Sequence, residues 1–185
     1  VSGCDALMLK EHRVLSSLQR STGDGFYGKY FPQPGESFRW HDRIVNTMRL
    51  RAGFVASDEI RRRYPGGIDA RHLAWMFNRC LEGIGFAHRN GWIHGAVLPT
   101  HMLFHPREHA VQLVGWIHAE RPGEALQAVP SAWTDWYPPE CVQRQAVTPA
   151  TDIYLLAKSI IWLGGDDPHT GQLPTGLPEE MGRLL

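Results

Sequence analysis

Three histidines recur at four-residue intervals in the second half of the chain, and imidazole is a common metal ligand. They are His101, His105 and His109. On a helix this spacing would place the three rings on one face, as in many zinc sites. Pro106 interrupts such a helix, and Met102–Phe104 reads better as a strand. We therefore expect loop or surface histidines and predict no metal site, while a His-based metal-binding protein stays open as an alternative.

Three long helices are predicted from the apolar periodicity, and they would position the polar residues. The first covers Leu7–Leu18. The second begins after the N-cap residue Asp69 and ends at Asn90–Gly91. The third opens on Thr148–Pro149, a cap followed by proline at the first helical position, and ends at Gly164–Gly165.

Shorter elements are predicted between these helices from turn residues and β-branched or aromatic runs. Strands are expected at Phe26–Phe31, Arg43–Leu50, Met102–Phe104 and Val111–Trp116, with a turn at Pro32–Gly35. Short helices are expected at Ser57–Arg63 and Glu179–Leu185, and an irregular stretch at Glu120–Pro139. The chain thus predicts a mixed α+β fold.

Composition narrows the class of protein. The chain has 185 residues, of which 43% are hydrophobic and 21% are charged, which is enough apolar material for a packed core. Lysine and arginine number 19, as do aspartate and glutamate, so no net positive charge favours nucleic-acid binding. Cys4, Cys80 and Cys141 form no CxxC pair, which favours free thiols in a reducing, cytoplasmic compartment. The longest apolar run, Ile153–Leu163, is too short to span a membrane.

The order of elements, taken with four local motifs, resembles a protein kinase from its αC helix to just past its αF helix. The four motifs are KEHRVLSSL at Lys10–Leu18, IHGAVLPTHMLF at Ile93–Phe104, YPPE at Tyr137–Glu140 and TDIYLLAKSIIWL at Thr151–Leu163. The first is similar to αC, the second to the catalytic loop HRDLKPENIL and its following strand, the third to the APE motif, and the fourth to αF. The resemblance implies a kinase-like α+β fold, mainly a helical C-lobe with αC and a remnant of the N-lobe sheet. Residues 1–50 would form the remnant, and residues 51–185 a C-lobe truncated after the αF-like helix.

The motifs depart from the family where its chemistry lies. In kinases the catalytic-loop Asp accepts the substrate proton, the Lys steadies the phosphate, and the Asn and the DFG Asp bind Mg²⁺. Here those four positions are held by Ala96, Leu98, His101 and Gly115, respectively. Alanine, leucine and glycine side chains accept no proton and bind no metal, and imidazole is a poor ligand for Mg²⁺. The chain also shows no Gly-rich phosphate loop and no lysine on a strand ahead of the αC-like helix.

Other kinase positions are kept. The resemblance places Glu11 at the ion-pairing Glu of αC, without a visible lysine partner. It assigns structural roles to His94 in the catalytic loop and to Glu140 of the APE-like motif, whose arginine partner is not apparent in this chain. It gives Asp152 the role of the αF carboxylate, which holds the loop backbone. It also suggests a candidate adenine pocket formed by Met48, Leu50 and Leu103.

These features predict a pseudokinase, a catalytically inactive kinase-like domain that acts as a binding, scaffold or allosteric module for a protein partner. Weak ATP binding without metal is left open, Mg²⁺ is not expected, and neither nucleic acid nor membrane is predicted as a partner. One alternative is a divergent active Ser/Thr kinase, which would use His101 or His118 as base and Asp135 as metal ligand. The other is the His-based metal-binding protein.

Overall fold

The structure, a computed structural model, describes residues 3–23, 25–49, 51–183 and 185. Leu50, expected in the adenine pocket, lies outside these residues. The fold is mixed α+β, as predicted at this coarse level. The α-helices are α1 (Gly3–Thr22), α2 (Ser57–Arg63), α3 (Ala70–Arg89), α4 (Pro139–Val142), α5 (Pro149–Leu163) and α6 (Glu179–Gly182). The strands are β1 (Pro34–Trp40), β2 (Arg43–Met48), β3 (Val55–Ala56), β4 (Met102–His105) and β5 (Ala110–Leu113). The 3-10 helices are η1 (Phe26–Tyr30), η2 (Pro99–His101), η3 (Trp116–His118) and η4 (Ser131–Trp136).

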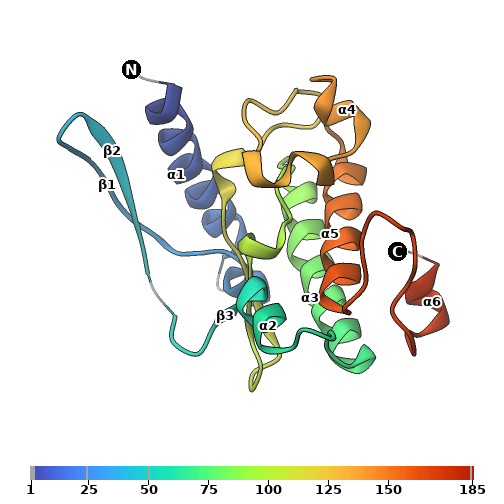
Figure 1. Cartoon of the computed structure of the whole chain (residues 1–185). Coiled ribbons are helices and arrows are strands. Elements are labelled where there is room, and N and C mark those ends of the chain that lie inside the picture. Colours follow the sequence, from blue (N-terminus) through green and yellow to red (C-terminus); the bar gives the residue numbers. More distant parts are fainter. Residues whose placement is uncertain (1–2, 24, 50, 184) are drawn as a thin grey trace.

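Two small antiparallel sheets flank a helical body. β1 and β2 form a hairpin, and β3, β4 and β5 form a three-stranded sheet in that order. Helices α3 and α5 lie side by side at the centre, and the β1–β2 hairpin stands out beside α1 on the far side from α6 (Figure 1). No helix among the described residues is both long and apolar enough to cross a membrane.

The two central helices follow their sequence signals. The Asp69 carboxylate accepts the Arg71 N–H at 2.8 Å and so caps α3, while Asn90 ends it and Gly91 takes a positive φ of 73°. At the start of α5, the Thr148 N–H donates to Thr151 Oγ1 at 3.2 Å. Leu73, Phe77 and Ile84 lie on one face of α3 and are buried, so α3 and α5 bury their apolar faces in one core. The predicted bounds of both helices are confirmed.

One buried cluster joins the first helix to this body. Val14, Leu15 and Leu18 of α1 are fully buried in the same core as Ile84 of α3 and Leu156 of α5. Burial of such side chains contributes about 2 kcal/mol each. Helix α1 is therefore packed into the body as well as against the hairpin.

The segments around the hairpin correct two predictions. Phe26–Phe31, expected as a strand, forms η1, because its short aromatic run packs by turning: Tyr27 stacks on Phe86 and Tyr30 is fully buried. The turn expected at Pro32–Gly35 is also wrong. Pro34 begins β1, and the chain reverses at His41, whose φ of 41° suits a tight hairpin turn.

Two further elements are shorter than predicted. The strand expected at Val111–Trp116 ends at Leu113, because Gly115 takes a φ of 82° and turns the chain into η3. The final helix covers only Glu179–Gly182 of the expected Glu179–Leu185.

Candidate functional site

Asp152 anchors the loop that we call the His94 loop, residues 92–101. Its carboxylate is fully buried in the first turns of α5. Its two oxygens accept the backbone N–H groups of His94 and Gly95, each at 2.8 Å. A third donor, His88 Nε2 of α3, lies 2.7 Å from Oδ2. Burying a carboxylate is costly unless such donors compensate it, so this triple contact fixes the loop to both central helices.

His94 holds the loop to the strand end on its other side. Because a carbonyl can only accept, His94 Nε2–H donates to the Val114 carbonyl at 2.9 Å, and Nδ1 accepts the Ala96 N–H at 3.2 Å. Its ring packs edge-on against Trp116, with centroids 4.4 Å apart. Complete burial lowers the pKa of His94 to about 3, although the nearby negative charge of Asp152 acts to raise it. The imidazole is therefore neutral, and both its nitrogens serve the architecture.

Ala96 and Gly115, which the resemblance places at the proton-accepting Asp and the metal-binding Asp, both lie against the ring of His101. His101 Nδ1–H donates to the Ala96 carbonyl at 2.8 Å. Its ring lies directly over Gly115, where a Cβ atom would be only 2.7 Å from His101 Cγ. The ring also stacks on His118, with centroids 5.7 Å apart, and burial lowers the pKa of His101. An imidazole thus fills the space that a side chain at position 115 would need.

A covering segment, residues 116–128, closes over the His94 loop. A Cβ atom at Gly95 would lie 2.6 Å from Leu126 Cδ2 and 2.8 Å from the His118 carbonyl oxygen. Gly95 has a φ of 72°, so glycine suits both the backbone and the lack of space. His118 holds the segment by donating from Nδ1 to the Ala128 carbonyl at 3.0 Å. Ala96 and Leu98 of the His94 loop are both completely buried.

Helix α1 contacts the covering segment through two adjacent side chains. Lys10, only 9% exposed, forms an ion pair with Glu120, which is 3% exposed. Glu11 accepts a hydrogen bond from Asn46 Nδ2 at 3.2 Å and another from the backbone N–H of Ile117. Burial raises the pKa of Glu11. The Lys10–Glu120 pair was not foreseen, because no local pattern links residues 110 positions apart.

The residues expected at an adenine pocket lie in different sheets. Met48 ends β2 of the hairpin and is 36% exposed. Leu103 is half-buried in β4, where it pairs with Ala56. Leu50 is not among the described residues, so the structure leaves this pocket a prediction.

Glu140 is the second residue of the short helix α4 and is half-buried. Its carboxylate has no hydrogen bond or ion pair with the part of the chain that the structure describes. Arg183, the nearest candidate in sequence order, pairs with Glu179 instead.

The evenly spaced histidines do not converge. His105 contacts the ring of Phe54, and His109 stacks on Trp75, whereas His101 lies in the His94 loop. Within residues 3–23, 25–49, 51–183 and 185, no three His, Cys, Asp or Glu side chains are arranged to hold a metal ion.

The donor set around Ala96 does not fit a divalent cation either. The described contacts that join Ala96, His101 and Gly115 include no carboxylate. His101 donates Nδ1–H to the Ala96 carbonyl, so this nitrogen is not available to a metal ion. Asp135, the metal ligand suggested for a divergent kinase, instead lies in η4, where it is 3.4 Å from His169 Nε2. Chemically, the described groups around Ala96 are neutral imidazoles and backbone groups, and both oxygens of Asp152 are taken by N–H donors, so this set lacks the free carboxylate that a Mg²⁺ site uses.

No protein-family model matches the chain, and no curated protein matches its sequence.

Proposed function

We propose that the chain is a protein-kinase-like domain that has lost phosphotransfer chemistry and acts by binding a protein partner. One observation carries the proposal. Asp152 holds the backbone of His94 and Gly95 through two 2.8 Å hydrogen bonds, while Ala96 and Gly115 carry no reactive group. The anchoring of the loop is kept and its chemistry is absent.

The order of elements supports the kinase-like assignment. A helix with Glu11 packs beside a hairpin, a long helix leads into the His94 loop, and the short hairpin of β4 and β5 ends two residues before Gly115. The irregular covering segment then leads to Pro138–Glu140 and to α5 with its buried Asp152. This is the order in which the resemblance places the corresponding motifs.

The size of the contributions that the missing groups would make supports a loss of catalysis. A positioned general base contributes roughly 10²–10⁴ in rate, and Ala96 cannot supply one. A metal ion neutralises the charge that spreads over the phosphate oxygens, and neither Gly115 nor the engaged His101 offers the oxygen that it needs. The neutral rings of His101 and His118 each donate Nδ1–H to a backbone carbonyl, so Nε2 of each ring is the proton acceptor that a divergent kinase would have to use.

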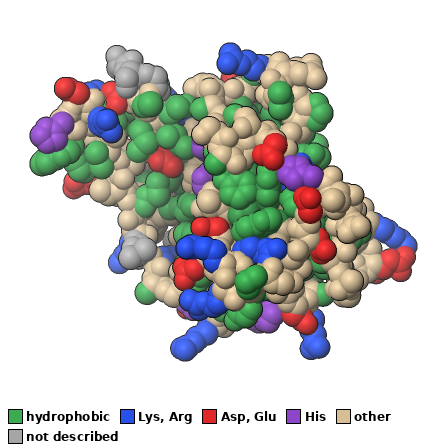
Figure 2. Space-filling model, viewed as in Figure 1, with side chains coloured by type: hydrophobic (Ala, Val, Ile, Leu, Met, Phe, Trp, Pro, Cys, Tyr) green, Lys and Arg blue, Asp and Glu red, His purple; other side chains and the backbone are tan. Residues whose placement is uncertain are grey.

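An exposed apolar face supports a binding role. Phe38 and Trp40 are two residues apart on β1, so their side chains lie on the same face of the hairpin. Phe38 is 40% exposed and Trp40 is 63% exposed. Val45 lies opposite Phe38 on β2. Figure 2 shows hydrophobic side chains among charged ones over this hairpin. Exposed aromatic patches commonly mark protein interfaces.

Phosphoryl transfer from radiolabelled ATP, measured on the chain with a panel of Ser, Thr and Tyr peptides, tests the loss of chemistry. We expect no incorporation above a blank without protein, with Mg²⁺ or Mn²⁺. The variant His101→Ala, purified in the same way, distinguishes a contaminating kinase from an activity of the chain itself, because the substitution changes only the latter. Robust transfer that this substitution abolishes would overturn the proposal and favour a divergent kinase.

A further inference from the structure

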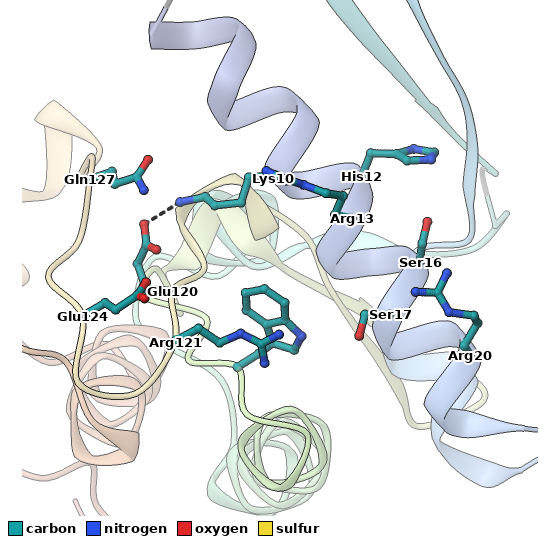
Figure 3. Close-up of a pocket in the computed structure, with 11 residues that line it drawn as sticks. Lys10, His12, Arg13, Ser16, Ser17, Arg20, Glu120, Arg121, Glu124 and Gln127 are labelled. Atoms are coloured by element: carbon teal, nitrogen blue, oxygen red, sulfur yellow. Dashed lines mark hydrogen bonds and ion pairs between the residues drawn. The ribbon is translucent and has the colours of Figure 1, made fainter.

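A hollow of about 690 Å³ lies between α1 and the covering segment, with Trp92, the first residue of the His94 loop, on its wall. Figure 3 shows side chains of α1 facing residues 120–127 across this space. The lining residues from α1 are Lys10, His12, Arg13, Ser16, Ser17 and Arg20; those opposite are Trp92, Glu120, Arg121, Glu124 and Gln127.

One face of α1 presents unpaired cations to the hollow. Arg13, Ser17 and Arg20 follow at intervals of four and three residues, which places them on one side of a helix. Neither Arg13 nor Arg20 forms an ion pair with the described residues. Exposed arginines elsewhere are of both kinds: Arg62 and Arg183 each pair with an acidic residue one helical turn earlier, whereas Arg107 forms no ion pair with the described residues.

The opposite wall holds a fixed third guanidinium. Arg121 Nη1 donates to the Gly91 carbonyl at 2.9 Å, and its guanidinium carbon lies 3.6 Å from the ring centroid of Trp92. A cation held by a carbonyl and an aromatic face loses little further freedom when it binds a ligand. Arg121 is therefore placed in advance of binding.

The balance of charge in the hollow is positive. Lys10 and Glu120 neutralise each other in their buried pair. Three arginines then face one carboxylate, Glu124, which leaves an excess of two positive charges in a chain whose formal net charge is zero. The hydroxyl groups of Ser16 and Ser17 add neutral donors to the same wall.

We infer that this hollow binds a phosphate monoester. Guanidinium groups match phosphate oxygens through paired N–H donors, and a dianion with three acceptor oxygens uses several cations and hydroxyls at once. A carboxylate brings one charge and two oxygens, so it satisfies this wall less completely. Arg13 and Arg20 are separated by about 10 Å along the helix axis, which their long side chains can span toward one group. The inference does not rest on the proposed function, because Arg13, Arg20 and Arg121 take no part in the hydrogen bonds of Asp152 and His94.

Isothermal titration calorimetry on the whole chain tests the inference. The probes are a short neutral peptide that contains one phosphoserine, the same peptide with serine, and inorganic phosphate. We expect the phosphopeptide to bind and the serine peptide not to bind. If inorganic phosphate binds as tightly as the phosphopeptide, the site is one for free phosphate. If inorganic phosphate binds more weakly than the phosphopeptide, the site is one for a phosphorylated side chain. Both outcomes support a phosphate site.

Matched variants locate the binding. The double variant Arg13→Gln/Arg20→Gln should weaken phosphopeptide binding at least about tenfold, because two charge-assisted contacts are lost. Glu124→Gln should strengthen it a few-fold by removing a repulsive charge. The control Arg62→Gln/Arg183→Gln removes the same charge elsewhere and should change affinity less than twofold. The inference is wrong if neither phosphate probe binds at millimolar concentration, or if the control weakens binding as much as the pocket variant.

Discussion

At the scale of single residues, the fully buried polar side chains of the candidate site hold backbone in place and have no polar atom left to react. Asp152 and His94 use all their oxygens and ring nitrogens on neighbouring backbone or on His88. Residue types alone could not reveal this, because an Asp and a His also suit catalysis. The resemblance to kinases suggested the structural role, and the hydrogen bonds of the two residues are consistent with it.

Asp152→Asn should destabilise the fold by about 2–4 kcal/mol, because the amide nitrogen cannot accept one of the three hydrogen bonds and the remaining donors lose their charged partner. Urea unfolding measures the change. Asp167→Asn, an exposed loop carboxylate that accepts the His169 N–H, is the control and should stay within about 0.5 kcal/mol. A similar, small effect of both substitutions would contradict the anchoring role of Asp152.

Stability should fall as the pH drops below about 6.5. The pKa of His94 is about 3 in the folded chain because of burial, and its unfolded value is 6.5, so the unfolded chain binds more protons between these values. Burial also lowers the pKa values of His101 and His118, which act in the same direction. Glu11, whose pKa is raised, partly offsets them, because its contribution weakens as the pH rises through that raised value.

Urea unfolding between pH 7 and pH 4.5 measures this dependence. His94 alone contributes a slope of up to about 1.4 kcal/mol per pH unit once its unfolded form is protonated. His118→Asn should flatten the curve, since it removes one of the three rings. A free energy of unfolding that stays constant or rises from pH 6.5 to pH 5 would show that these imidazoles accept protons in the folded chain.

At the scale of elements, local signals predicted the long helices and missed features set by packing. Asp69 and Asn90–Gly91 mark the ends of α3 within the sequence itself, so its bounds could be predicted. The strand predicted at Phe26–Phe31 was wrong, because six residues with several aromatics carry no periodicity that distinguishes a strand from a 3-10 helix such as η1. The contact of Lys10 with Glu120 depends on how α1 docks, and no spacing rule reaches across the chain to predict it.

The Lys10–Glu120 pair should join α1 to the covering segment. Lys10→Met leaves Glu120 buried without its cation, and we expect a loss of about 3 kcal/mol in the free energy of unfolding. Glu120→Gln should cost a similar amount. The double variant should be more stable than the sum of the two losses predicts, because neither change then leaves an unpaired charge.

Denaturant unfolding of the four proteins measures this coupling. Arg62→Met, at an exposed pair with Asp58, is the control and should change stability by less than about 0.5 kcal/mol. Strictly additive losses for Lys10→Met and Glu120→Gln would mean that the two side chains do not act as a pair.

At the scale of the whole molecule, the mixed α+β class could be predicted, since alternating helix and strand signals run through the chain. The candidate site could be predicted only in part. The sequence located Ala96 and Gly115 through the resemblance, but the ring of His101 over Gly115 and the closure of Leu126 over Gly95 arise from side-chain packing. Together these contacts describe a loop that is held firmly and closed by its own neighbours.

The metal dependence of nucleotide binding tests the central claim most directly, because a kinase site uses the cation to hold the phosphates, and the residues around Ala96 cannot hold one. Thermal unfolding of the chain should be followed with ATP in Mg²⁺ and with ATP in EDTA, each against its nucleotide-free buffer. We predict the same shift in melting temperature in both conditions, whether that shift is zero or small. A shift that is clearly larger with Mg²⁺, and that His101→Ala removes, would contradict the claim that this loop has lost its chemistry.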